Sequence, residues 1–239
     1  MKIVLNKPKA LNALDLQMVK DVDSLRPQIE KSRVFWMEGA GGKAFCAGGD
    51  VVRLYHAKIK ENNLDENFTF FREEFSLDYN LSQMKSLQVA NWDGIVMGGG
   101  VGISAFAPFI IASENSMYAM PEAKIGFFTD VGAAYFLSRL RSNLGHYLGI
   151  SGNRLKGEDV YIAGLANYFI PREKIPDAYA ELKSEMKNSG DAKNIVMQVL
   201  GKYHQQPQRK TLANEDKINE IFSKGSMREI YQYLQKSEG

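Results

Sequence analysis

Residues 120–140, MPEAKIGFFTDVGAAYFLSRL, combine two acids, an apolar turn and a run of small residues. Two carboxyl residues, Glu122 and Asp130, stand eight positions apart on either side of the apolar turn at residues 125–128. The run of small residues that follows predicts a buried helix, with Thr129 or Asp130 as its N-cap. The stretch therefore predicts one acid on a loop and the other at the start of a helix.

These two positions give the carboxyl groups different environments. An apolar wall raises the pKa of a carboxyl group, whereas the N-terminus of a helix lowers it. Two acids whose pKa values are pushed apart can work together as acid and base. The alternative is that neither acid is catalytic, because aspartate is common at N-caps and a single loop glutamate such as Glu122 is usually solvated.

Two glycine clusters upstream favour the catalytic interpretation. Residues 47–50 read AGGD and residues 97–100 read MGGG, each between a predicted strand and a predicted helix. Glycines at such a junction leave backbone N–H groups bare, and these can bind a phosphate or stabilise an oxyanion. A tight turn without a ligand is the alternative at residues 47–50. Three successive glycines are costly to order, which favours a closely approaching ligand at residues 97–100.

The composition limits the classes of protein that fit. The 239 residues suffice for one large domain or for a domain with an appendage. A net charge of +2 is too small to indicate nucleic acid or an anionic membrane as partner. The single cysteine, Cys46, excludes an internal disulfide framework and is expected in the core, and the three histidines lack metal-ligand spacing. No apolar run approaches the roughly 18 residues of a membrane span.

Short strands alternate with helices along the chain. Strands are predicted at residues 2–5, 34–37, 87–92, 109–112 and 116–120, and a last strand ends at residue 170. Helices are predicted at 12–31, which Pro27 ends or kinks, and at 51–55, 68–84, 103–107, 139–150 and 157–163. Residues 56–67 are expected to form a mobile polar loop, and one face of the helix at 68–84 is expected to carry Phe68, Phe71, Phe75 and Leu81. The alternation implies an α/β fold with βαβ crossovers.

Four motifs in order resemble the enoyl-CoA hydratase/isomerase, or crotonase, superfamily. They are KAFCAGGD at residues 43–50, GIVMGGGVG at 94–102, MPE at 120–122 and IGFFTDVG at 125–132. Within the superfamily the chain is most similar to the 3-hydroxyisobutyryl-CoA hydrolase branch. FFREE at residues 70–74 and RLKGEDVY at 154–161 fit that branch as well. One motif alone would be a weak signal, but several in order over most of the chain are specific.

The resemblance implies the fold and the ligand. The fold would be α/β, a crotonase-like spiral of ββα turns over residues 1–170, with a helical C-terminal region over residues 171–239. The ligand would be an acyl-CoA whose thioester oxygen lies between the N–H groups of Gly49 and Gly99, with Gly48 and Gly98 beside the substrate. Such donors stabilise the charge that develops on an attacked carbonyl. The resemblance also implies a homo-oligomer, usually a trimer or hexamer.

The branch assignment has a chemical basis. Hydratases of the superfamily carry a second catalytic glutamate at the position of Gly102, so water addition to a double bond would lack one acid here. The resemblance implies instead that Glu122 attacks the thioester or activates a water to do so. Asp130 would hold the substrate's hydroxyl group or that water, and Glu74 matches a glutamate of the substrate pocket. No metal and no cofactor are implied, since CoA is part of the substrate.

Some features depart from the pattern. Thr129 stands in place of the usual proline, Ala133 and Ala134 replace smaller residues, and Asp93 replaces the usual histidine or asparagine. Family members normally have one more strand before residue 2 and a further helical region after residue 239, so the resemblance implies a shortened chain. It also implies valine catabolism in the mitochondrial matrix. No targeting segment is visible, which says little because Met1 leads almost directly into a strand.

Two other functions remain open at this point. One is another crotonase-type hydratase or isomerase, against which Gly102 argues. The other is a non-catalytic subunit of a larger assembly, such as a mitochondrial ribosomal small subunit. Shortened ends and the altered Thr129 and Ala133 would suit a structural subunit, whereas the intact acids and glycines would not. Nucleic acid is otherwise not expected as a partner, because the basic residues of the tail fit a solvated helix face.

Overall fold

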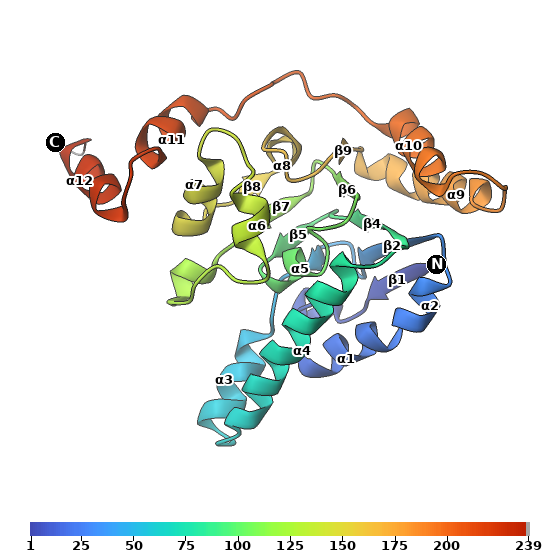
Figure 1. The fold of residues 1–239 in the computed structure, drawn as a ribbon, viewed down its shortest axis with the longest axis horizontal. Coiled ribbons are helices and arrows are strands. Elements are labelled where there is room, and N and C mark those ends of the chain that lie inside the picture. Colours follow the sequence, from blue (N-terminus) through green and yellow to red (C-terminus); the bar gives the residue numbers. More distant parts are fainter. Residues whose placement is uncertain (238–239) are drawn as a thin grey trace.

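The strands of the protein are divided between two sheets (Figure 1). In the computed structural model, which describes residues 1–237, the first sheet is parallel and has the order β1 (Lys2–Leu5), β2 (Val34–Gly39), β4 (Leu87–Asn91), β6 (Phe109–Ala112) and β9 (Tyr168–Phe169). The second contains β3 (Ala44–Cys46), β5 (Ile95–Met97), β7 (Met117–Ala119) and the antiparallel β8 (Leu155–Lys156). From β2 to β7, successive strands enter alternate sheets. This arrangement is the predicted spiral of ββα turns.

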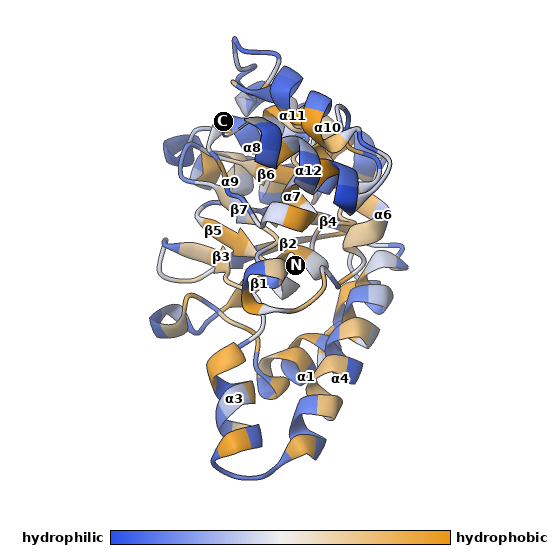
Figure 2. Cartoon of the chain, turned by 90° about the vertical axis from the view of Figure 1, so that its left-hand side faces the viewer, coloured by the Kyte–Doolittle hydropathy of each residue, from blue (hydrophilic) through white to orange (hydrophobic). Residues whose placement is uncertain are grey.

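Helices and short turns cover both sheets. In chain order they are η1 (Pro8–Ala10), α1 (Leu16–Ser24), α2 (Arg26–Glu30), α3 (Val51–Ile59), α4 (Leu64–Ser82), α5 (Gly99–Gly102), η2 (Glu122–Ile125), α6 (Ala133–Leu137), α7 (Leu144–Ser151), α8 (Glu158–Ile162), η3 (Arg172–Lys174), α9 (Ile175–Glu185), α10 (Ala192–Tyr203), α11 (Glu215–Phe222) and α12 (Met227–Ser237). Strands β3, β5 and β7, which carry the chain to the site, lie at mid-height on the left of the molecule in Figure 2.

Strand β2 shows why the sequence has continuous apolar runs. Phe35 and Met37 belong to the core beneath the first sheet, whereas Val34 and Trp36 belong to a second core on its other face. A parallel strand that is covered on both faces needs apolar residues at every position. The buried run at residues 34–37 therefore marks the first sheet as an inner layer.

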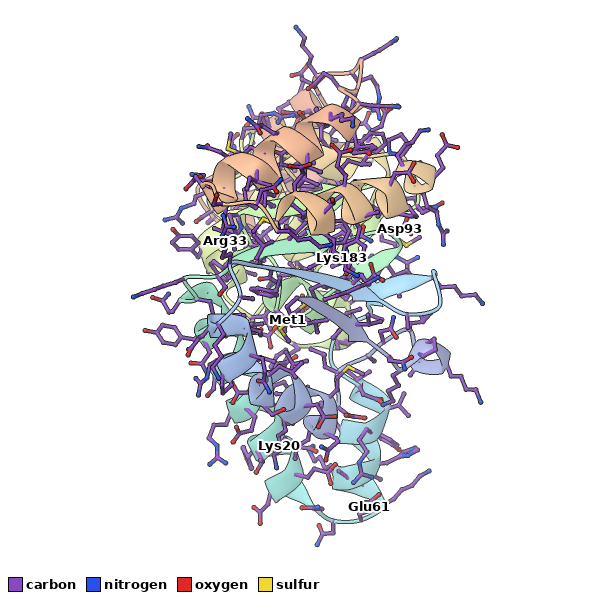
Figure 3. The ribbon with its side chains drawn as sticks, turned by 90° about the vertical axis from the view of Figure 1, so that its right-hand side faces the viewer. Met1, Lys20, Arg33, Glu61, Asp93 and Lys183 are labelled. Atoms are coloured by element: carbon purple, nitrogen blue, oxygen red, sulfur yellow. The ribbon has the colours of Figure 1, made fainter. Side chains whose placement is uncertain are left out.

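Helices α9 and α10 form the cover over the second core. Ile175, Leu182, Val196, Val199 and Leu200 pack there against residues of β2, β4 and β6. In Figure 3 these helices lie on the opposite side of the sheet from α1 and α4, and Glu61 marks the far tip of the α3–α4 pair. Residues 172–203 thus share a core with the strands.

Several predicted boundaries were wrong. The helix expected at residues 12–31 is two helices, since Asp15 caps α1 and Pro27 lies in the first turn of α2. The mobile loop expected at residues 56–67 is mostly helical, because α3 runs to Ile59 and α4 begins at Leu64. Arg53 closes the short connection through ion pairs to Glu61 and Glu66.

The four residues expected near one face of α4 differ in their exposure. Phe68 is 72% exposed and Phe75 is 38% exposed. The helix instead buries Phe70, Glu74, Leu77, Asp78 and Leu81. The inner face of α4 carries Glu74 and Asp78, because the neighbouring glycine loops leave room there for carboxyl groups.

The expectation for Cys46 is confirmed by the structure. Cys46 is fully buried, and burial raises the pKa of its thiol to about 12, so it is a core residue rather than a nucleophile. Within residues 1–237, no helix has the length and apolar character that a membrane crossing requires.

Candidate active site

Glu122 lies directly after the second sheet, as the first residue of η2. Strand β7 delivers the chain to Pro121, and the turn places the Glu122 side chain inside, where the residue is only 6% exposed. Its Oε2 atom has no hydrogen-bond partner in the described part of the chain. A buried, unpartnered carboxyl oxygen is costly, and such groups call for a functional explanation.

The two predicted glycine loops contact each other beside Glu122. A Cβ atom at Gly48 would lie 3.0 Å from the carbonyl oxygen of Met97 and 3.5 Å from the amide nitrogen of Gly99. A Cβ atom at Gly98 would lie 2.9 Å from Oε1 of Glu122. Gly48 and Gly98 also have φ values of +98° and +47°. The positive φ values favour glycine at both positions, and a side chain at either would crowd the other loop or Glu122.

The amides of Gly49 and Gly99 are available for a ligand. Neither N–H donates a hydrogen bond within residues 1–237. Gly99 is the first residue of α5, where helix geometry leaves the N–H without an intrahelical acceptor. The sequence analysis expected a helix only after the glycines, at residues 103–107, and this was wrong because α5 consists of residues 99–102 themselves.

Helix α4 brings two further acids to this place. Glu74 is 2% exposed, and its Oε1 lies 2.1 Å from where a Cβ atom at Gly99 would be. Asp78 follows one helical turn later, and its Oδ2 lies 2.7 Å from where a Cβ atom at Gly102 would be. The sequence analysis found Glu74 but missed Asp78. The signal was present, because both acids fall on the same stripe as Phe70.

Asp130 completes the group, but its surroundings differ from the prediction. Helix α6 begins at Ala133 with Gly132 as its N-cap, so neither Thr129 nor Asp130 caps it. The expected lowering of the Asp130 pKa by a helix N-terminus is therefore wrong. Burial raises that pKa instead.

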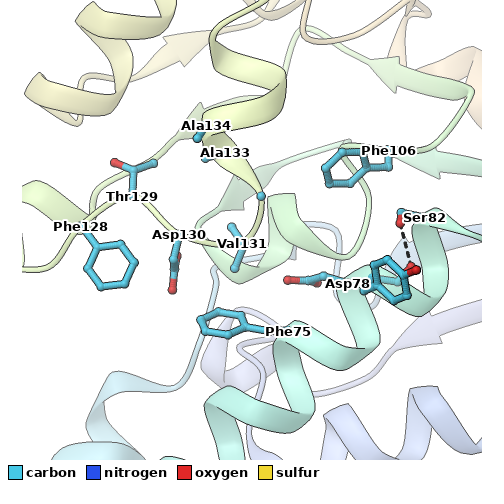
Figure 4. Close-up of a pocket in the computed structure, with 12 residues that line it drawn as sticks. Phe75, Asp78, Ser82, Phe106, Phe128, Thr129, Asp130, Val131, Ala133 and Ala134 are labelled. Atoms are coloured by element: carbon cyan, nitrogen blue, oxygen red, sulfur yellow. Dashed lines mark hydrogen bonds between the residues drawn. The ribbon is translucent and has the colours of Figure 1, made fainter.

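All seven predicted site residues line one cavity of about 500 Å³: Gly48, Gly49, Glu74, Gly98, Gly99, Glu122 and Asp130. They come from four segments that are far apart in the sequence. A second cavity of about 450 Å³ lies next to it and shares Asp130 and Val131 with it (Figure 4). Three residues that depart from the family pattern, Thr129, Ala133 and Ala134, line this second cavity.

The acids influence one another. Burial, opposed by a backbone hydrogen bond and assisted by the charge of Asp130, raises the pKa of Glu122 to about 7. Burial and the charges of Asp130 and Glu122 raise the pKa of Glu74 to about 8. Burial and the charges of Glu74 and Asp130 raise the pKa of Asp78 well above its usual value. At neutral pH the cavity therefore holds protonated and ionised carboxyl groups together.

Cations are scarce at this site. Lys58 is the only lysine or arginine among the described residues that line the cavity. In residues 1–237, no group of three or more His, Cys, Asp or Glu side chains is arranged to hold a metal ion. The amides of Gly49 and Gly99 are donors that can polarise a carbonyl oxygen in this cavity.

Gly102 leaves no room for the second glutamate of a hydratase. A Cβ atom at Gly102 would lie 2.6 Å from Cβ of Val131 and 2.7 Å from Oδ2 of Asp78. A larger residue at this position would displace both neighbours. The chemistry of the cavity therefore depends on Glu122, Asp130 and Glu74.

A two-sheet spiral with buried acids and bare amides in one cavity defines a crotonase-like α/β protein. A family model described as "Enoyl-CoA hydratase/isomerase" matches residues 1–239, and the chain belongs to this family.

Named relatives agree with this assignment. The chain is 39% identical over 254 residues to "3-hydroxyisobutyryl-CoA hydrolase, mitochondrial" of Dictyostelium discoideum, covering 100% of this chain and 65% of that protein. It is 43% identical over 244 residues to the Xenopus tropicalis protein of the same name, covering 97% and 61%. A solved structure of a carnitinyl-CoA dehydratase from Mycobacterium thermoresistibile is 30% identical, with a TM-score of 0.86, covering 100% of this chain and 68% of that one. The chain thus spans less than two thirds of the length of these two hydrolases.

Proposed function

We propose that the chain hydrolyses a short-chain 3-hydroxyacyl-CoA thioester, 3-hydroxyisobutyryl-CoA, to 3-hydroxyisobutyrate and CoA in valine catabolism. The observation that carries the proposal is the convergence of Glu122, Asp130, Gly49 and Gly99 on one cavity. The names of the relatives support the choice of substrate. Gly102, which Val131 and Asp78 crowd, disfavours the hydratase alternative.

The proposed reaction uses groups that the cavity already holds. The thioester oxygen accepts hydrogen bonds from the amides of Gly49 and Gly99, which stabilise the negative charge as the carbonyl is attacked. Glu122 either takes a proton from a water that attacks the carbonyl carbon, or attacks that carbon itself and forms a mixed anhydride, which water then cleaves to release the acid and restore Glu122. The carbon–sulfur bond breaks, and CoA leaves as the thiol. A pKa of about 7 lets Glu122 be ionised for the attack yet return a proton near neutral pH.

Asp130 and Glu74 are proposed to bind the substrate's polar groups. Asp130 is half-buried on the edge of the cavity and would accept a hydrogen bond from the 3-hydroxyl group or from the attacking water. Glu74, whose raised pKa favours its protonated form, would line the substrate pocket with Gly48 and Gly98. The reaction would need no cofactor and no metal.

The surroundings of the protein are part of the same proposal. The names of the relatives include the word mitochondrial, which supports the mitochondrial matrix as the location. A homo-oligomer is the proposed state. Exposed aromatic residues, namely Phe68 on α4 and Tyr79 and Phe128 at the second cavity, are consistent with a contact surface.

A comparison of three thioesters tests the substrate class. We expect CoA release from 3-hydroxyisobutyryl-CoA to exceed release from isobutyryl-CoA, which lacks the hydroxyl group. Methacrylyl-CoA separates the alternatives, because a hydratase would add water to its double bond without releasing CoA. Loss of the methacrylyl double bond faster than CoA release from 3-hydroxyisobutyryl-CoA would overturn the hydrolase assignment.

A further inference from the structure

Val131, directly after Asp130, has an unusual backbone conformation. Its φ value is +44°, in the left-handed region that β-branched residues rarely adopt. Gly132 follows with a φ of +76°, which a glycine adopts without strain. Strained residues of this kind persist only where the surrounding structure holds them, and they cluster at functional sites.

Gly102 and Asp78 provide the surroundings that hold Val131. Val131 is 4% exposed. Gly102 has no side chain, and the Cβ of Val131 and an oxygen of Asp78 lie beside the space where its Cβ would be. Figure 4 shows the Val131 side chain between the carboxyl groups of Asp130 and Asp78. Both oxygens of Asp78 are buried without a hydrogen-bond partner in residues 1–237, so its role is not that of an ordinary ion pair.

We propose that Val131 is a positioning residue for Asp130. Its left-handed backbone, packed against Gly102 and Asp78, turns the chain so that the Asp130 carboxyl group faces the cavity that contains Glu122. The inference rests on the proposed hydrolase function, because it assigns to Val131 a role in that reaction. It adds a residue that acts through Asp130 and does not itself react.

The position of Asp130 has an electrostatic consequence that can be measured. The charge of Asp130 contributes to the raised pKa of Glu122. The other groups that face these two acids are Glu74 and Asp78 on α4, Tyr118 on β7 and, across the cavity, Lys58 on α3. If Asp130 turned away, the pKa of Glu122 would fall, and Glu122 would ionise at a lower pH.

The first test is Val131→Gly, which removes the side chain that packs against Gly102 and Asp78 and leaves the backbone at this position free to adopt other conformations. We expect kcat to fall by about ten- to a hundredfold with a smaller change in KM, because the reacting groups are misplaced. We also expect a shift in the acid limb of the pH profile, that is, the fall of kcat/KM toward low pH: the limb should move to lower pH. In an Asp130→Asn background, Val131→Gly should have little further effect on kcat or on the limb. A matched control, Val199→Gly, removes a buried valine from α10 and should leave the limb in place.

A second variant reaches the same contact from the other side. Gly102→Ala places a Cβ atom against Val131 and should move the acid limb in the same direction as Val131→Gly. Circular dichroism and thermal unfolding show whether each variant is folded. If Val131→Gly does not fold, Gly102→Ala decides the question.

Carbon-13 NMR separates this inference from the hydrolase assignment. In protein labelled at the glutamate side-chain carboxyl carbons, the Glu122 signal is assigned with Glu122→Gln and titrated without substrate. A lower Glu122 pKa in Val131→Gly or Gly102→Ala supports the positioning role even if no thioester is hydrolysed. An unchanged Glu122 pKa and acid limb in the folded variants would overturn it, even if hydrolysis is confirmed. An equal loss of kcat in the Asp130→Asn background would also overturn it.

Discussion

Glu122 unites the two properties that the proposed reaction needs from one side chain. Burial in a cavity with few cations raises its pKa to about 7, and one of its oxygens has no hydrogen-bond partner in the described residues. Such a carboxylate is more basic than an exposed glutamate and is not occupied by another contact. The sequence singled out Glu122 as a candidate, whereas its burial depends on the turn η2 and on loop 97–100.

The pH dependence of hydrolysis follows from this pKa. Protonated Glu122 can neither attack a carbonyl nor accept a proton, so kcat/KM should fall as the pH drops through about 7. Asp130→Asn removes a negative charge that raises the pKa of Glu122, so the acid limb should shift to lower pH even though activity is reduced. Steady-state kinetics from pH 5 to 9, on the order of one measurement per half unit, would show the shift. An acid limb near the usual glutamate pKa would contradict this account.

Glu74 should make the folded protein less stable as the pH rises. Its folded-state pKa is about 8, above the usual value of 4.5, so its neutral form is favoured by folding. The favourable contribution is fully present below pH 4.5 and is lost as the pH rises through about 8. Glu74→Gln removes this loss, and we expect it to stabilise the protein at pH 8.5 by about 1–3 kcal/mol relative to wild type.

Urea unfolding of wild type and Glu74→Gln at pH 5 and pH 8.5 checks this prediction. The difference in free energy of unfolding between the two proteins should be largest at pH 8.5 and should shrink at pH 5. A difference that does not depend on pH would mean that the Glu74 carboxyl group titrates normally in the folded state. Reduced hydrolysis by the stabilised variant would fit the trade-off between stability and activity at functional sites.

At the scale of elements, loop 47–50 depends on the start of α3. Asp50 caps this helix by accepting a hydrogen bond from the amide of Arg53, at 3.0 Å. Its other oxygen accepts a hydrogen bond from Lys7 at 2.8 Å, and Lys7 also binds Asp15, the N-cap of α1. The cap and the ion pairs fix the loop that presents the Gly49 amide.

Asp50→Ala should therefore affect both stability and catalysis. Loss of the cap should lower the free energy of unfolding by about 1 kcal/mol. It should also lower kcat, because the Gly49 amide would be held less firmly. Asp191→Ala is the matched control, since Asp191 caps α10 in the same way and lies away from the cavity. Equal effects of the two substitutions on kcat would contradict a role for Asp50 in holding the loop.

The elements also show what the sequence could and could not predict. The alternating pattern identified most strands, because buried parallel strands need continuous apolar residues. It missed α5, since glycine is a poor helix former and residues 99–102 are helical only through close contacts with Cys46 and α4. It also missed the extent of α3, whose residues Val51, Val52, Tyr55 and Ile59 are exposed and give no inward stripe.

At the scale of the whole molecule, the spiral explains how distant segments reach one cavity. Loop 47–50 follows β3, loop 97–100 follows β5, and Glu122 follows β7, and these three strands are parallel neighbours in the second sheet. The carboxyl ends of parallel strands meet at one edge of a sheet, where ligands commonly bind. The motifs predicted this convergence. The place of Asp78 and the left-handed Val131 could not be predicted, because they arise from packing between α4, α5 and the segment after Asp130.

The proposed function requires that this cavity hydrolyses an acyl-CoA thioester through Glu122. The most direct measurement is the release of free CoA from 3-hydroxyisobutyryl-CoA, followed with a thiol reagent, by the wild-type chain and by Glu122→Gln. We predict release by the wild type and a loss of about a hundredfold or more in the variant, with binding of the thioester retained. Equal release by both proteins, or no release by a wild-type chain that binds the thioester, would contradict the claim.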